Sequence, residues 1–137
     1  MIEMELSKIV IDEKRHDQLI ALKEKGGSRV LPIVIGLNEA SAIKLKISGF
    51  NPPRPLTHDL ISAIIKDFEA TVEKVIIDKL EDNTFHAKLI IKTKGGSLRT
   101  IDARPSDSIA LAVRFQAPIL VEDEIIKQYE LFNKEKT

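Results

Sequence analysis

Residues 71–103 decide the fold, and they read TVEKVIIDKLEDNTFHAKLIIKTKGGSLRTIDA. Two runs rich in β-branched residues, 71–80 and 84–93, flank the polar tripeptide EDN at 81–83, and the tetrapeptide KGGS at 94–97 precedes a third run. Asn and Gly readily take the positive φ angles that tight hairpin turns require. The stretch therefore predicts three consecutive antiparallel strands.

The first third of the chain repeats this pattern. Strands are predicted over residues 3–12, 17–23 and 29–36, and a second KGGS tetrapeptide at 25–28 forms the turn between the last two. Pro32 lacks a backbone N–H, so it predicts an edge or strand-end position for the third of these strands.

Four further segments have helical spacing or residues that favour a helix start. They are residues 38–48, begun by Asn38 and stopped by Gly49; 57–68, capped by Thr57 and carrying an apolar stripe of Leu60, Ile61, Ile64, Ile65 and Phe68; 104–116, opened by Pro105 or Ser106; and 122–132. Between the last two, residues 117–121 read as a short buried strand.

Hairpin strands mixed with interspersed helices predict the α+β class. We expect a single compact domain over residues 1–137, with a mixed or antiparallel sheet and three to four helices. Its core spans about residues 3–124, and a C-terminal helix and tail occupy 122–137. No Pro/Gly/Ser-rich linker or internal repeat divides the chain.

The composition, with 43% hydrophobic and 31% charged residues, is that of a folded globular protein and excludes disorder. There is no apolar run of membrane-spanning length and no signal-peptide pattern at the start, so we expect no membrane association and a cytoplasmic location. The lack of cysteine excludes disulfides, thiolate zinc sites and thiol nucleophiles.

The formal net charge is zero, with 21 Lys and Arg against 21 Asp and Glu. Proteins that bind nucleic acid mainly by displacing counterions usually have a basic excess, so any such function must rest on a local site. One locally basic face includes Lys88, Lys92 and Lys94, which are the candidates for contact with a nucleic-acid backbone. The alternative is a solvated strand face without a ligand.

The motifs for P-loop, Rossmann and zincin sites are absent, and three polar places remain. In the first, His58 and Asp59 stand at a predicted helix start. A first-turn acid also has a purely structural explanation, because it interacts favourably with the helix dipole. In the second, Arg54 lies between two prolines that restrict its backbone, which suits a fixed anion clamp. A loop arginine paired with a carboxylate is the alternative.

The third place is the sequence DARPSD at residues 102–107, where a predicted strand turns into a helix. Asp102 and Asp107, together with Glu39 from the start of another helix, offer the oxygen ligands that Mg²⁺ accepts. Helix capping and salt bridges explain the same residues without chemistry, and spacing alone leaves both interpretations open.

These segments resemble the bifunctional nuclease domain family. The resemblance rests on RVLPIVIG at 29–36, RPLTHDL at 54–60, TFHA at 84–87, IDARPSDSIALA at 101–112 and API at 117–119, in that order. It implies an α+β domain with a mixed sheet, a homodimer, and nuclease activity of the kind reported for some members on both DNA and RNA.

From the resemblance we expect a nuclease that hydrolyses phosphodiester bonds of DNA or RNA. The chemistry of the polar residues themselves adds a divalent cation, Mg²⁺ or Mn²⁺, and the residue roles that follow. Its expected residues are the following: Glu39, Asp102 and Asp107 for the cation, with Asp59 as a fourth candidate; His58 as general acid or base; Arg54 and Arg104 as phosphate clamps; and Lys88, Lys92 and Lys94 as guides for the backbone. The alternative function is a non-catalytic dimeric binding or regulatory module whose polar motifs are structural.

Overall fold

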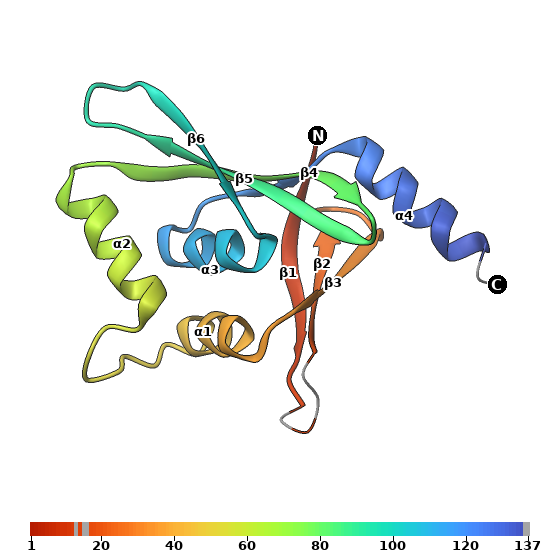
Figure 1. The fold of residues 1–137 in the computed structure, drawn as a ribbon, viewed down its shortest axis with the longest axis horizontal. Coiled ribbons are helices and arrows are strands. Elements are labelled where there is room, and N and C mark those ends of the chain that lie inside the picture. The colour runs from red at the N-terminus through yellow and green to blue at the C-terminus, as the bar shows by residue number, and fades with distance from the viewer. Residues whose placement is uncertain (13, 15–16, 136–137) are drawn as a thin grey trace.

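A seven-stranded sheet and four helices make up the part of the chain described by the computed structural model, residues 1–12, 14 and 17–135 (Figure 1). The elements, in chain order, are β1 (Ile2–Val10), β2 (Gln18–Glu24), β3 (Val30–Ile35), α1 (Leu37–Ile47), α2 (Thr57–Asp67), β4 (Thr71–Glu81), β5 (Thr84–Lys92), β6 (Leu98–Ala103), α3 (Pro105–Phe115), β7 (Ile119–Val121) and α4 (Asp123–Glu135). The predicted α+β class is confirmed.

The strands follow the order β3-β2-β1-β7-β4-β5-β6 in one mixed sheet. Two antiparallel units of three strands, β1–β2–β3 and β4–β5–β6, are joined by β7. Strand β7 pairs antiparallel with β1 and parallel with β4. Strand β3, which contains Pro32, is an edge strand, as its missing N–H predicts.

The sheet curls, so the strands of its two halves run in clearly different directions (Figure 1). Irregular pairing contributes to this shape, because β4 has two register shifts against β5 and β1 has one against β2. Such bulges increase local twist and bend the strand. Helices α1, α2 and α3 lie together beside the curled sheet, and α4 extends from its other end.

The core lies between the sheet and the helices. Its largest completely buried side chains come from both halves of the sheet and from α1 and α3: Ile20, Leu22, Leu31, Ile43, Val75, Ile77, Ile109 and Val121. Helix α3 contacts α1, α2, β4 and β5, so it is the central helix of this layer. Its many buried small and apolar residues fit that position.

Two predicted helix caps were wrong. Helix α1 begins after Gly36 and α2 after Leu56, so Asn38 and Thr57 lie inside the first turns and do not cap them. In α2 the Leu56 N–H instead donates to Oδ2 of Asp59, at 3.0 Å. The third-position acid thus replaces the expected hydroxyl cap.

The apolar stripe predicted for α2 is only half covered. Ile61 and Ile65 pack against the core, whereas Leu60, Ile64 and Phe68 are exposed. Helix α2 lies at the margin of the helical layer, so its stripe extends past the edge of the core. None of the helices within the described residues is long and apolar enough to cross a membrane.

Candidate functional site

The first turns of three helices meet at Arg104. Glu39 is the third residue of α1, His58 the second of α2 and Asp107 the third of α3, and Arg104 immediately precedes α3. Four of the residues predicted for the site, Arg104 included, therefore come together from distant parts of the sequence. The helix N-termini also direct the positive ends of their dipoles toward this place, which favours negatively charged groups there.

The four side chains form one bonded chain, which we call the Arg104 cluster. Nε2 of His58 lies 2.9 Å from Oδ1 of Asp107. Arg104 donates from Nε to Oδ2 of Asp107, at 2.9 Å, and from Nη2 to Oε1 of Glu39, also at 2.9 Å. His58 is 7% exposed, whereas the Arg104 side chain is 66% exposed. The cluster thus runs from a buried histidine to a solvent-facing guanidinium.

The geometry of the cluster fixes the tautomer of His58. An ionised carboxylate only accepts hydrogen bonds, so Nε2 carries the hydrogen that faces Asp107. Nδ1 of the neutral ring is then an acceptor, and it has no hydrogen-bond partner among the described residues. This nitrogen is therefore able to take a proton from a substrate or from water.

Arg104 remains fully charged in this setting. Hydrogen bonding and charge attraction from Asp107 raise its pKa, burial lowers it by less, and Glu39 adds a further increase. A guanidinium with most of its surface in solvent is well suited to binding phosphate oxygens.

A groove of about 560 Å³ adjoins the Arg104 cluster. Besides the four cluster residues, aliphatic side chains from α2, β5, β6 and α3 line it: Ile61, Ile65, Leu89, Ile91, Ile101 and Leu111. The cluster forms its polar part and these side chains form the apolar remainder.

Gly36 makes room for the Glu39 carboxylate. A Cβ atom at position 36 would overlap Oε2 of Glu39, so only glycine leaves this carboxylate in its observed place. The need is steric, since φ at Gly36 is −77° and any residue can adopt that angle.

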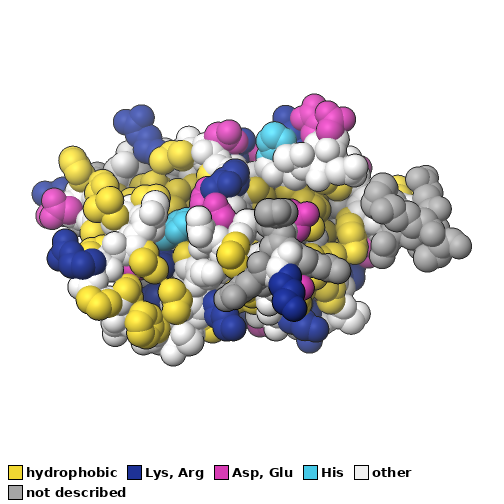
Figure 2. All heavy atoms as spheres, turned by 60° about the horizontal axis from the view of Figure 1, so that its bottom comes forward, with side chains coloured by type: hydrophobic (Ala, Val, Ile, Leu, Met, Phe, Trp, Pro, Cys, Tyr) yellow, Lys and Arg dark blue, Asp and Glu magenta, His cyan; other side chains and the backbone are white. Residues whose placement is uncertain are grey.

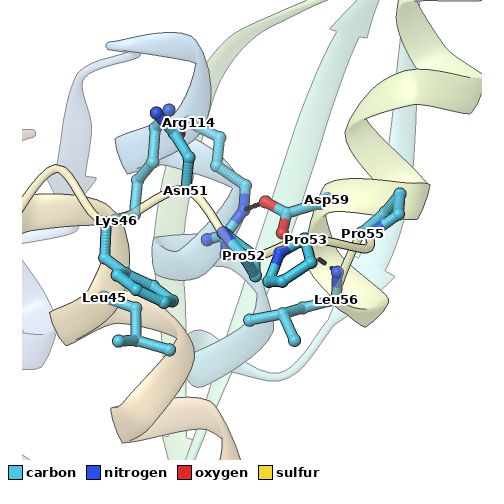
Figure 3. Close-up of a pocket in the computed structure, with 10 residues that line it drawn as sticks. Leu45, Lys46, Asn51, Pro52, Pro53, Pro55, Leu56, Asp59 and Arg114 are labelled. Carbon is cyan, nitrogen blue, oxygen red and sulfur yellow. Dashed lines mark hydrogen bonds and ion pairs between the residues drawn. The ribbon is translucent and has the colours of Figure 1, made fainter.

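Asp59 does not share the groove with His58, because successive helical residues point about 100° apart. Its carboxylate accepts from Nε of Arg114, at 2.8 Å, inside a separate pocket of about 340 Å³ walled by the proline-rich loop (Figure 3). The Arg114 side chain is 4% exposed and also donates to the carbonyl of Ala110. Burial raises the pKa of Asp59, but Arg114 and the Leu56 N–H lower it by more. This ion pair connects α2 to α3.

Arg54 is exposed in the same proline-rich loop, between two prolines that line the Asp59 pocket. It makes no hydrogen bond or ion pair with the residues that the structure describes. The structure therefore gives Arg54 no contact with the Arg104 cluster, and its predicted clamp role stays a prediction.

Asp102 points to the other face of the sheet. It pairs with Lys88 across β5 and β6, and its carboxylate accepts from Nζ of Lys88 at 2.9 Å. That bond lowers the pKa of Asp102 and raises that of Lys88. Side chains alternate along a strand, so its neighbours Ile101 and Ala103 face the groove and Asp102 does not. The expected carboxylate set of Glu39, Asp102 and Asp107 is therefore not brought together.

The predicted lysines also lie away from the groove. Lys88 and Lys92 alternate with groove residues along β5, and Lys94, in the following turn, is paired with Glu69 at 2.7 Å. No group of three His, Asp or Glu side chains able to hold a metal ion occurs among residues 1–12, 14 and 17–135.

Sequence reasoning missed Arg114 and Gly36. Arg114 was given no role from the sequence, and it is buried in α3. The available signal is its position in the otherwise apolar run IALAVRF at 109–115, where a charged side chain needs a buried partner. Gly36 has no such signal, because its role depends on how Glu39 folds back.

The model of the bifunctional nuclease domain matches residues 19–134. The chain belongs to the bifunctional nuclease domain family. The match spans the whole Arg104 cluster, and it confirms the resemblance that the sequence motifs indicated.

Individual relatives in this family differ in how closely they match. An uncharacterized protein of Mycobacterium tuberculosis (strain H37Rv) is 40% identical over 92% of this chain and 74% of its own length. Bifunctional nuclease 1 of Oryza sativa subsp. indica is 24% identical, and bifunctional nuclease 2 of Oryza sativa subsp. japonica is 29% identical. These matches cover 83% and 81% of this chain but only 35% of each rice protein.

Proposed function

We propose that this protein is a phosphodiester hydrolase that acts on nucleic acid at the Arg104 cluster. The observation that carries the proposal is the bonded chain His58–Asp107–Arg104–Glu39 at the end of a groove. It combines a proton acceptor, a group that orients it and an exposed guanidinium, in a family whose rice members are named bifunctional nucleases.

In the proposed reaction, Nδ1 of His58 takes a proton from the attacking water. The water oxygen forms a bond to phosphorus, the bond from phosphorus to the leaving oxygen breaks on the opposite side, and that oxygen takes a proton from solvent, to which the His58 imidazolium then releases its own. Asp107 holds the ring in the reactive tautomer and stabilises the imidazolium. Arg104 binds the non-bridging oxygens, where negative charge increases in the transition state.

Glu39 is a positioning residue in this proposal. Its carboxylate accepts from Nη2 of Arg104, which also lies 2.8 Å from Oδ2 of Asp107, so two carboxylates hold the guanidinium.

Dependence on Mg²⁺ or Mn²⁺ stays a prediction from the sequence. The residues present fit a resident cation poorly, because both carboxylates of the cluster are already bonded to Arg104 and Asp102 faces elsewhere. The proposed reaction therefore has no step on a metal ion, and the cleavage assay compares Mg²⁺ and Mn²⁺ with chelator.

The test is hydrolysis of end-labelled single-stranded DNA and RNA by purified protein, with Mg²⁺, with Mn²⁺ and with EDTA. His58→Gln removes the proton acceptor, and we expect a loss of 100-fold or more. His86→Gln is the matched control, since His86 lies on β5 outside the groove lining. Equal rates for both variants and the parent protein would contradict the proposal.

A binding module without catalysis is the second candidate, and two observations favour it. Every carboxylate of the cluster is ion-paired, as in a structural brace, and the stripe of Leu60, Ile64 and Phe68 is exposed as in many interaction surfaces. No cleavage under any condition by protein shown to be folded would favour this function. The homodimer and the cytoplasmic location stay predictions.

A further inference from the structure

The groove beside the Arg104 cluster is apolar along most of its length. Six aliphatic side chains from four elements line it, and its volume of about 560 Å³ lies within the range of about 300–1,000 Å³ usual for small-ligand sites. An open apolar cavity of this size leaves water in contact with hydrocarbon, so a ligand with an apolar face gains free energy by displacing that water.

The charged side chains of the groove all belong to the Arg104 cluster, because the remaining lining residues are aliphatic or uncharged. Ile65 lies two helical turns beyond His58 on α2, and Ile91 lies four residues beyond Ala87, the strand partner of Ala103. The apolar part therefore leads away from the guanidinium. A ligand that matches both parts has an anionic group attached to an apolar body.

A nucleotide has this construction. We propose that the groove holds an unpaired base next to the phosphate bound by Arg104, so that the substrate is single-stranded DNA or RNA. This inference rests on the proposed function and specifies its substrate class. A base within a duplex is stacked and paired, and extracting it costs a few kcal/mol.

The lining also predicts little base selectivity. The six aliphatic side chains contact the faces of a base and form no hydrogen bonds with its edges, so this part of the groove does not distinguish one base from another. Phe68 lies seven residues beyond Ile61, on the same side of α2 and about 10 Å further along its axis. It is exposed with Leu60 and Ile64 in the hydrophobic region seen over α2 on the left of Figure 2, where a neighbouring base can stack.

Methyl NMR tests the base site without any need for turnover. The His58→Gln variant, with labelled isoleucine δ1 methyls, is titrated with single-stranded dT4 and separately with a blunt hairpin duplex. We expect upfield ring-current shifts of Ile61, Ile65 and Ile101 with dT4 and smaller shifts with the duplex. Ile47, exposed on α1 outside the groove, is the internal control. Equal shifts with both probes, or no shift in the groove at saturating dT4, would overturn the inference.

A pair of variants on β6 tests the same inference through activity. Ile101 lines the groove and Leu98 does not, yet both are exposed on the same edge strand. We expect Ile101→Glu to reduce cleavage of single strands at least tenfold and Leu98→Glu to change it less than twofold. Ile101→Asn serves as a milder variant if thermal melting shows that the glutamate unfolds the protein.

The two proposals fail in different ways. Cleavage of a duplex as fast as of the corresponding single strand would overturn the single-strand inference and leave the hydrolase proposal intact. Absence of cleavage on every substrate would refute the hydrolase, and the methyl titration would still decide whether the groove binds an unpaired base. The third outcome is an equal loss of cleavage activity in Ile101→Glu and Leu98→Glu, together with a molecular mass in sedimentation that is half that of the parent protein. This result would identify β6 as a contact between subunits and overturn the base site.

Discussion

At the residue scale, Gly36 controls a carboxylate three positions away. Because a Cβ at position 36 would overlap Oε2 of Glu39, Gly36→Ala displaces this carboxylate without changing any charge. We expect the proposed nuclease activity to fall about tenfold, equivalent to about 1.4 kcal/mol, since the carboxylate that anchors Arg104 must shift. Gly95→Ala, in a hairpin turn with open space around it, is the control in the same cleavage assay.

A double-mutant cycle tests whether Gly36 acts only through Glu39. If Gly36 acts only through Glu39, then Gly36→Ala adds nothing to the effect of Glu39→Gln. Additive losses in the two variants would show that Gly36 acts by another route.

The Asp59–Arg114 ion pair gives a pH-dependent contribution to stability. The pKa of Asp59 is lowered in the folded protein, so its contribution is complete above the unfolded value of about 3.9 and is lost as the pH falls through the lower folded value. We expect Asp59→Asn to reduce the free energy of unfolding by about 3 kcal/mol at neutral pH, because Arg114 is left buried without its partner.

Urea unfolding from pH 7 to pH 2 measures this dependence. The difference in free energy of unfolding between Asp59→Asn and the parent protein decreases at the acid end of this range, where Asp59 itself becomes protonated. Asp67→Asn, exposed on the same helix, changes stability by less than about 0.5 kcal/mol throughout. A difference that persists unchanged at pH 2 would contradict the assignment.

Individual site residues were predictable where their partners also lie at helix starts. His58 and Asp107 were both expected at the site and are bonded to each other. Asp59 and Asp102 were expected beside them but face other pockets and surfaces, one because of the helical rotation per residue and the other because of strand alternation. Composition cannot distinguish these carboxylates, since only the orientation of each element decides which of them meet.

At the scale of single elements, α3 ends on a residue in a strained conformation. Gln116 has φ 54° and ψ 38°, in the left-handed region where glycine is more stable. We expect Gln116→Gly to increase the free energy of unfolding by about 0.5–1 kcal/mol in urea titrations. Gln128→Gly, in the interior of α4, is expected to decrease the free energy of unfolding by about 1 kcal/mol.

Element boundaries were predicted to within a few residues, because alternation, proline and turn glycines are local signals. The apolar stripe of α2 was also present in the sequence, but its exposure was not, since the stripe does not record where the helical layer ends. The order of strands in the sheet was also not predictable from the sequence. The short strand β7 shows no preference for β1 or β4 as neighbours, and only packing of the whole chain places it between them.

At the scale of the whole molecule, the absence of net charge predicts weak dependence on salt. A nucleic acid held chiefly at Arg104 releases few counterions, so the logarithm of the affinity for a single strand falls with the logarithm of salt concentration with a slope of about −1. Fluorescence anisotropy with a labelled octamer measures this slope. We expect Arg104→Gln to reduce the magnitude of this slope by about 0.7. In the same titration, Lys92→Gln tests the prediction that lysines guide the nucleic-acid backbone. A slope of −5 or steeper would contradict a small binding site.

The position of β7 has a consequence for how the chain is made. Residues 1–35 and 71–103 can each form a three-stranded meander from neighbouring sequence, but the strand that joins them, Ile119–Val121, emerges from the ribosome after both. Until then, β1 and β4 each present an open edge that is able to pair with other nascent chains. The interval between synthesis of residue 103 and residue 121 is therefore the period in which this protein most needs a chaperone.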